Sequence, residues 1–185
     1  AASDIDFIHL IENTGMKILV ATEKPFAKKA VDGIRQIVEG AGYELALLEK
    51  YTDKSELLSA VADVDALIIR SDKVTAEVIE AARNLKIVVR AGAGYDNVDL
   101  AAATARGIVV MNTPGQNSNA VAELALAMMI FMARNGFTPG TGSEIQGKTL
   151  GIHAYGNVGR LVGRKGKAMG MNVIAYDPFI TDSAV

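Results

Sequence analysis

The chain lacks cysteine altogether, which removes two classes of structure. Without thiols neither disulfide cross-links nor thiolate metal sites can form, and a reducing, cytoplasmic compartment fits this composition. Only two histidines are present, His9 and His153, so we do not expect a zinc site. We therefore predict a fold without a metal, held together by its hydrophobic core.

Long apolar runs and an excess of one charge are also missing. No segment reaches the ~20 apolar residues of a membrane span, and the nearest, residues 120–133, is short and contains Glu123. The 19 basic and 21 acidic residues are interspersed, without a basic stripe or patch for nucleic acid or a membrane surface. Residues 1–15 lack the features of a signal peptide and are expected to be a leader or extension. We therefore expect neither a nucleic-acid nor a membrane partner.

Half of the residues are hydrophobic, and they form short runs that alternate between strand-like and helix-like patterns. Continuous Val/Ile/Leu runs are typical of parallel strands covered on both faces. Five βα repeats predict an α/β fold with a flavodoxin-like parallel-sheet domain over residues 16–113. We expect Thr75 to cap the third helix. The expected strands are 16–21, 43–48, 66–70, 85–90 and 108–111, and the expected helices are 27–39, 55–61, 76–82 and 100–106.

A turn-rich segment that begins at Thr113 separates this domain from the rest. Residues 119–134 are apolar on nearly every face, which predicts a helix buried between domains or subunits. Its methionines are expected to pack in a core or an interface, and Glu123 to be stabilised by the helix N-terminus. Residues 135–143 are the expected linker. The apolar helix and the cut-off sheet that follows favour a homodimer.

Residues 148–178 have the order of a dinucleotide-binding unit: strand 149–153, glycine turn, helix 157–169, strand 172–176 and a terminal acid, Asp177. Such a turn lets backbone approach a pyrophosphate, and the helix N-terminus stabilises its charge. Asp177 favours NAD over NADP, because a carboxylate repels a 2′-phosphate. Residues 114–185 are thus predicted to hold an interdomain helix and the incomplete start of a Rossmann NAD-binding domain. The alternative is a tight turn whose glycines serve packing alone.

Two details of this turn are open. Ala154 replaces the first glycine of the fingerprint and can make the turn if its φ is negative. His153 precedes the turn and is interpreted as a satisfied strand histidine rather than a general base.

Two arginines close neighbouring strands of the first domain. Arg90 precedes a loop of small residues whose N–H groups can form an anion nest, and Arg70-Ser71 ends another strand. A lone arginine at a strand end is usually solvated. Two of them at the carboxyl edges of one sheet favour a small dianionic ligand.

Seven short motifs are informative together. They are Ile69-Arg-Ser, Arg90-Ala-Gly-Ala-Gly-Tyr-Asp-Asn-Val-Asp, Val110-Met-Asn-Thr-Pro, Asn119-Ala-Val-Ala-Glu-Leu, Gly147-Lys-Thr-Leu-Gly-Ile, Gly156-Asn-Val-Gly-Arg and Tyr176-Asp-Pro. With these motifs the chain resembles the D-isomer-specific 2-hydroxyacid dehydrogenases, and most closely the members that act on 3-phosphoglycerate. The resemblance runs from about residue 16 to the end.

The resemblance implies NAD-dependent oxidation of 3-phosphoglycerate to 3-phosphohydroxypyruvate, the entry to serine synthesis. It assigns substrate contacts to Arg70, Ser71, Arg90, Ala91, Gly92, Gly94 and Asn117. It assigns cofactor contacts to Ala93, Tyr155, Gly156, Asn157, Val158, Gly159, Asp177 and Pro178.

The family's catalytic arginine, glutamate and histidine come from later segments, so we expect no catalytic residue here and binding without turnover. Asn157, where family members often have arginine, is a further departure. The alternatives are a noncatalytic NAD-binding or interaction module and a dehydrogenase of another 2-hydroxy acid, such as glyoxylate.

Overall fold

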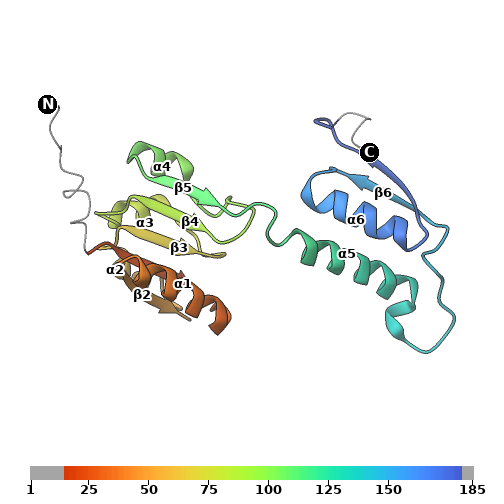
Figure 1. Cartoon of the computed structure of the whole chain (residues 1–185), viewed down its shortest axis with the longest axis horizontal. Helices are drawn as coiled ribbons and strands as arrows, with labels where there is room; N and C mark the ends of the chain where they lie inside the picture. Colours follow the sequence, from red (N-terminus) through yellow and green to blue (C-terminus); the bar gives the residue numbers. More distant parts are fainter. Residues whose placement is uncertain (1–14, 181–185) are drawn as a thin grey trace, which may run out of the picture. The chain divides into compact units, whose positions relative to one another are not determined.

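The computed structural model describes residues 15–180, which form two compact units that divide between Thr113 and Pro114 (Figure 1). The leader expected over residues 1–15, with His9, lies outside the described residues except for Gly15. The first unit contains β1 (Lys17–Thr22), α1 (Lys28–Gly40), β2 (Glu44–Glu49), α2 (Lys54–Ala60), β3 (Ala66–Ile69), α3 (Ala76–Ala81), β4 (Ile87–Arg90), α4 (Leu100–Ala105) and β5 (Val109–Asn112).

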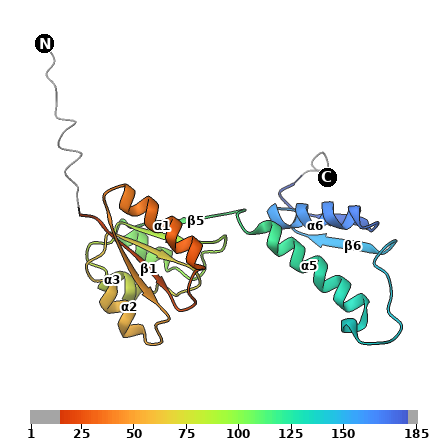
Figure 2. The same ribbon diagram turned by 60° about the horizontal axis from the view of Figure 1, so that its bottom comes forward.

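Five parallel strands form the sheet of this unit, in the order β2-β1-β3-β4-β5. This is the flavodoxin-like order, so the predicted fold class is confirmed. Figure 2 shows α1 on one side of the sheet and α2 and α3 on the other. Because helices cover both faces, the central strands carry apolar residues without alternation.

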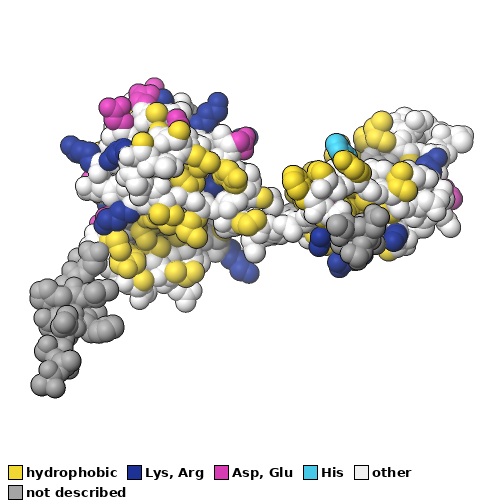
Figure 3. All heavy atoms as spheres, turned by 90° about the horizontal axis from the view of Figure 1, so that it is seen from above, with side chains coloured by type: hydrophobic (Ala, Val, Ile, Leu, Met, Phe, Trp, Pro, Cys, Tyr) yellow, Lys and Arg dark blue, Asp and Glu magenta, His cyan; other side chains and the backbone are white. Residues whose placement is uncertain are grey.

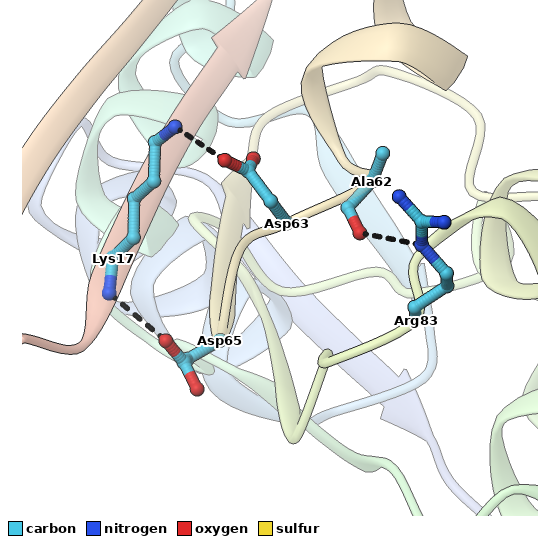
Figure 4. Close-up of polar contacts among 5 residues, drawn as sticks. All are labelled: Lys17, Ala62, Asp63, Asp65 and Arg83. Atoms are coloured by element: carbon cyan, nitrogen blue, oxygen red, sulfur yellow. Dashed lines mark hydrogen bonds and ion pairs between the residues drawn. The ribbon is translucent and has the colours of Figure 1, made fainter.

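The core of the first unit lies between the sheet and these helices. Leu19, Leu67, Ile69 and Val88 come from the three central strands and are at most 2 % exposed. At the amino edge of the sheet the Asp65 carboxylate accepts hydrogen bonds from the Lys17 backbone N–H, 3.0 Å away, and from the Lys86 ammonium, 2.8 Å away. Figure 4 shows the Lys17 ammonium bound to Asp63 and the Lys17 backbone nitrogen bound to Asp65. These contacts fix the edge opposite the strand ends that carry the arginines.

One capping prediction is wrong. Thr75 occupies the N-cap position of α3, but its side chain makes no capping hydrogen bond, and its Oγ1 is buried without a partner. The side-chain caps of this unit are aspartates: Asp53 accepts from the Ser55 N–H at α2, and Asp99 accepts from the Ala102 N–H at α4.

The second unit contains α5 (Ser118–Ala133), a short 3₁₀ turn η2 (Asn135–Phe137), β6 (Thr149–His153), α6 (Asn157–Ala168) and β7 (Asn172–Tyr176). β6 and β7 pair in parallel, and α6 packs on both strands and against α5. The predicted linker folds back on α5, since the Ser143 N–H donates to the Ala133 carbonyl and Phe137 packs edge-to-face on Phe131.

The predicted burial of α5 between domains or subunits stays a prediction, because within the second unit only one stripe of the helix is covered. Ser118, Ala122 and Leu126 form its single buried stripe, and most of the other large side chains are exposed, with Met132 at 73 %. Met128 is also exposed, so it packs in no core of the described residues, and its packing in an interface stays a prediction. Within residues 15–180, no helix combines the length and the apolar character needed to cross a membrane.

Candidate functional site

The two arginines lie at neighbouring strand ends of the first unit. Ile69 of β3 pairs with Arg90 of β4, and Arg90 pairs with Asn112 of β5, so the three strands end at nearly the same level. Arg70 and Ser71 follow β3 directly and are exposed. Ligands of open parallel sheets bind at this carboxyl edge. The fold therefore brings Arg70-Ser71 next to the loop that Arg90 begins.

The loop after Arg90 is held by backbone and amide contacts. The Ala91 N–H donates to the Ile69 carbonyl, and the Asn112 amide donates to the Ala93 carbonyl at 2.7 Å. Gly92 is buried under the Arg90 side chain, and a Cβ at this position would overlap the guanidinium. The Arg90 Nε is buried without a partner. The loop is thus preformed, with a cation lying along it.

A buried carboxylate, Asp72, ties this edge together. The Asp72 Oδ1 accepts hydrogen bonds from the Tyr51 hydroxyl at 2.8 Å and the Glu23 N–H at 2.7 Å, and its Oδ2 accepts from the Arg70 N–H at 3.3 Å. Burial, with the bond to Asp72, raises the pKa of the Tyr51 phenol well above its usual value, so the hydroxyl remains a donor. Sequence reasoning missed Tyr51 and Asp72.

A cavity of about 440 Å³ opens beside this carboxylate in the first unit. Its lining comes from the loops after β1, β2 and β3 and from α2, and most of the lining residues have polar side chains. The lining residues include Glu23, Tyr51, Lys54, Ser71, Lys73 and Thr75.

The nucleotide turn of the second unit begins after β6. Gly156 is the N-cap of α6, and a Cβ added to it would meet no protein atom within 4 Å. A Cβ at Gly159 would instead collide with the Ala154 carbonyl oxygen. The two glycines therefore have different roles. Gly159 lets α6 approach β6, whereas Gly156 leaves the N-terminus of α6 open. Asn157 and Val158, the first residues of α6, are the predicted backbone donors to a pyrophosphate.

The condition placed on Ala154 is not met, because its φ is +83°. This left-handed conformation is unfavourable for a residue with a Cβ by about 1–2 kcal/mol. Ala154 nevertheless occupies the turn, since its N–H donates to the Tyr176 carbonyl and Gly159 packs against its own carbonyl.

We expect Ala154→Gly to stabilise the second unit by about 0.5–1 kcal/mol, because relief of the left-handed strain outweighs the entropy that glycine loses on folding. Urea unfolding followed by circular dichroism measures the change. Ala168→Gly, at the end of α6, is the matched control and should be destabilising. A loss of stability in both variants would contradict the strain assigned to Ala154.

Asp177 connects the end of β7 to the glycine turn. Its carboxylate accepts hydrogen bonds from the Phe179 N–H at 2.9 Å and the Tyr155 N–H at 2.7 Å. These bonds, the one from Phe179 first, hold the pKa of Asp177 below its usual range. Each oxygen keeps a free lone pair, so an ionised acceptor for a ribose hydroxyl stands beside the turn.

Two further interpretations need correction. His153 is exposed rather than satisfied within the strand, and its ring stacks on Tyr176 with centroids 5.6 Å apart. A histidine lies among hydrophobic side chains in Figure 3. Glu123 lies beyond the first turn of α5 and is explained by contacts to Asn119 at 2.7 Å and Lys165 of α6 at 3.5 Å.

The remaining predicted residues divide between the units. Asn117 is the N-cap residue of α5, without a side-chain capping bond, and Pro178 is exposed after β7. The part of the chain that the structure describes holds no group of three or more acidic or histidine side chains arranged for a metal ion.

Comparison with known proteins identifies the family of the chain. A family model, D-isomer specific 2-hydroxyacid dehydrogenase, catalytic domain, matches residues 18–185. Hydroxypyruvate reductase of Thermotoga maritima is 43 % identical over 149 residues, which cover 73 % of this chain and 49 % of that protein. D-3-phosphoglycerate dehydrogenase of Archaeoglobus fulgidus is 42 % identical over 180 residues, which cover 90 % of this chain and 33 % of that protein.

Among solved structures, NAD+-bound 3-phosphoglycerate dehydrogenase of Entamoeba histolytica matches with a TM-score of 0.87 and 53 % identity, over 90 % of this chain and 55 % of that one. The chain thus spans less than half the length of the two curated relatives. Since the family model covers nearly all residues, the chain belongs to the D-isomer specific 2-hydroxyacid dehydrogenase family.

Proposed function

We propose that this chain supplies the substrate anchors and the first nucleotide-binding unit of an NAD-dependent dehydrogenase that oxidises 3-phosphoglycerate to 3-phosphohydroxypyruvate. The observation that carries the proposal is the pairing of Ile69 with Arg90, which puts Arg70 and Arg90 at adjacent strand ends. Two guanidinium groups suit a substrate with a carboxylate and a phosphate, since arginine binds either anion through paired hydrogen bonds. The relatives that act on 3-phosphoglycerate support this choice.

The proposed substrate contacts are made by the exposed edge of the first unit. Arg70 and Ser71 take the phosphorylated part, and Arg90 with Ala91, Gly92 and Gly94 lines the carboxylate end. Asn117 belongs to the second unit and is carried over from the family resemblance alone. These residues bind and orient the substrate, and we assign no proton transfer to them.

The proposed cofactor contacts are made by the turn of the second unit. The open space at Gly156 and the N-terminus of α6 fit a pyrophosphate, and Asp177 fits the adenosine ribose. Tyr155, Asn157, Val158, Gly159 and Pro178 complete this set. Ala93 belongs to the first unit and is carried over as a cofactor contact from the family resemblance alone. When bound, NAD+ supplies the hydride acceptor.

A second candidate is a dehydrogenase of an unphosphorylated 2-hydroxy acid. It is favoured by the similarity to a hydroxypyruvate reductase. The number of cationic anchors separates the two candidates, because an unphosphorylated acid does not need both Arg70 and Arg90.

Isothermal titration of the chain with 3-phosphoglycerate, D-glycerate and glyoxylate tests the proposal. We expect 3-phosphoglycerate to bind at least about tenfold more tightly than D-glycerate, since one charge-assisted anchor contributes roughly 1.5–3 kcal/mol. Equal affinities for the two acids would favour the second candidate. Binding of NAD+ without binding of any acid would favour a noncatalytic module.

The homodimer and the cytoplasmic location stay predictions. Exposed side chains of α5 support self-association, since monomers rarely expose a large apolar patch. They include Val121, Leu124, Met128, Phe131 and Met132. We expect sedimentation equilibrium to give a mass of twice the 19.5 kDa of one chain. A mass of 19.5 kDa would contradict the homodimer.

A further inference from the structure

Asp72 is the most unusual polar residue of the first unit. It is 3 % exposed, and among the described residues it takes part in no ion pair. A buried carboxylate without a cation is costly unless hydrogen bonds replace its lost hydration. Three donors do so here: the Tyr51 hydroxyl and the backbone N–H groups of Glu23 and Arg70.

The donors come from three different strand ends. Glu23 follows β1, Tyr51 follows β2, and Arg70 follows β3, so one carboxylate joins segments up to 49 residues apart. The Asp72 carbonyl also accepts from the Asn97 amide at 2.7 Å. Asn97 lies in the loop that starts at Arg90, and the backbone carbonyl of Asn97 accepts a hydrogen bond from the Val74 N–H at 2.9 Å. Asp72 thus connects the segments that carry both arginines.

The core beneath this edge is apolar, but an aliphatic residue of the same volume would leave the Glu23 and Arg70 N–H groups and the Tyr51 hydroxyl without their acceptor. The carboxylate orients the backbone at Arg70. One of its oxygens accepts a hydrogen bond from the Arg70 N–H, while Glu23 and Tyr51 hold the other oxygen in place. The position of the Arg70 backbone, and hence the reach of its guanidinium, follows from this arrangement.

We propose that Asp72 is a positioning residue. Together with Tyr51 it fixes the Arg70-Ser71 backbone so that Arg70 contacts the phosphorylated end of the substrate. This rests on the proposed function, because it assumes that Arg70 contacts a phosphorylated acid. Asp72 touches no substrate itself and acts through Arg70.

Asp72→Asn is the first test. The amide oxygen should take the place of Oδ1, where it serves both Glu23 and Tyr51, so that the N–H₂ group faces the Arg70 N–H and this contact is lost. We expect the dissociation constant for 3-phosphoglycerate to rise about fivefold or more, with the constant for NAD+ unchanged. Tyr51→Phe keeps the ring packing and should act in the same direction, with a smaller effect.

Asp65→Asn is the matched control for general destabilisation. It also removes a carboxylate that accepts a backbone N–H in the same sheet, but at the opposite edge (Figure 4). We expect it to change 3-phosphoglycerate affinity less than about twofold. Equal weakening by Asp65→Asn and Asp72→Asn would overturn the proposal, because both would then act through the stability of the unit.

A double-mutant cycle with Arg70→Ala separates positioning from direct contact. If Asp72 acts through Arg70, Asp72→Asn should weaken binding less than about twofold in the Arg70→Ala background. Additive losses would overturn the proposal while leaving Arg70 as an anchor. If Arg70→Ala has no effect, the proposed function fails at this site.

Amide hydrogen exchange tests whether Asp72 fixes the Arg70 backbone, even if 3-phosphoglycerate does not bind. The Arg70 amide should exchange at least about tenfold faster in Asp72→Asn than in Asp65→Asn, since only the former removes its acceptor. Equal exchange rates at Arg70 in the two variants would contradict the positioning role.

Discussion

Gly156→Val should abolish detectable NAD+ binding by this chain and lower its unfolding free energy by no more than about 1 kcal/mol, because valine is a poorer N-cap residue than glycine. A Cβ at Gly156, the N-cap of α6, meets no atom within 4 Å beyond its chain neighbours, so no large packing cost is expected. The added methyl groups would instead fill the space in front of the N-terminus of α6. A pyrophosphate bound there must approach the backbone closely.

Gly159→Ala is the matched variant, with the opposite expectation. Its Cβ would collide with the Ala154 carbonyl oxygen, so α6 must move away from β6 at a cost of about 1–3 kcal/mol. Urea unfolding and calorimetric titration with NAD+ on both variants give the comparison. Retention of NAD+ binding by a well-folded Gly156→Val variant would contradict the assignment of this turn to the cofactor.

Arg70→Ala should weaken 3-phosphoglycerate binding about 10- to 100-fold without changing the affinity for NAD+. A charge-assisted hydrogen bond to a phosphate contributes roughly 1.5–3 kcal/mol, which corresponds to this range. The exposed side chain of Arg70 contributes little to the core, so the fold should not suffer. Arg70→Lys should recover part of the affinity, since lysine keeps the charge but not the paired geometry.

Arg35→Ala is the control for loss of one positive charge. Arg35 lies on α1, where it pairs with Glu39 at 2.8 Å. The same titration should show no change in 3-phosphoglycerate affinity. If Arg35→Ala and Arg70→Ala weaken binding equally, the effect is long-range attraction rather than an anchor at the strand end.

The sheet of the first unit was predictable because its strands are buried on both faces. Apolar runs such as residues 66–69 and 87–90 can be recognised as buried strands without knowing which strands they pair with. The arginines at their ends can be placed in the same way. The glycine turn was also predictable, because strand, turn, helix and acid follow one another closely in the sequence.

Features that depend on distant partners were not predictable. Nothing in the residues next to Asp72 indicates that Glu23 and Tyr51, 49 and 21 positions away, would surround it. The left-handed Ala154 depends on the close approach of Gly159. The apolar composition of α5 predicts burial between domains or subunits but does not specify what covers the helix, and within the second unit only one stripe is buried.

The most direct test of the account is a two-step titration of the ¹⁵N-labelled chain, followed by backbone amide shifts. NAD+ should move the amides of residues 155–159 and Asp177, and 3-phosphoglycerate added next should move those of Arg70, Ser71 and residues 90–94. This result would support a chain that carries a nucleotide turn and a phosphorylated-acid anchor. Saturating concentrations of both compounds that leave these two sets of amides unmoved would contradict it.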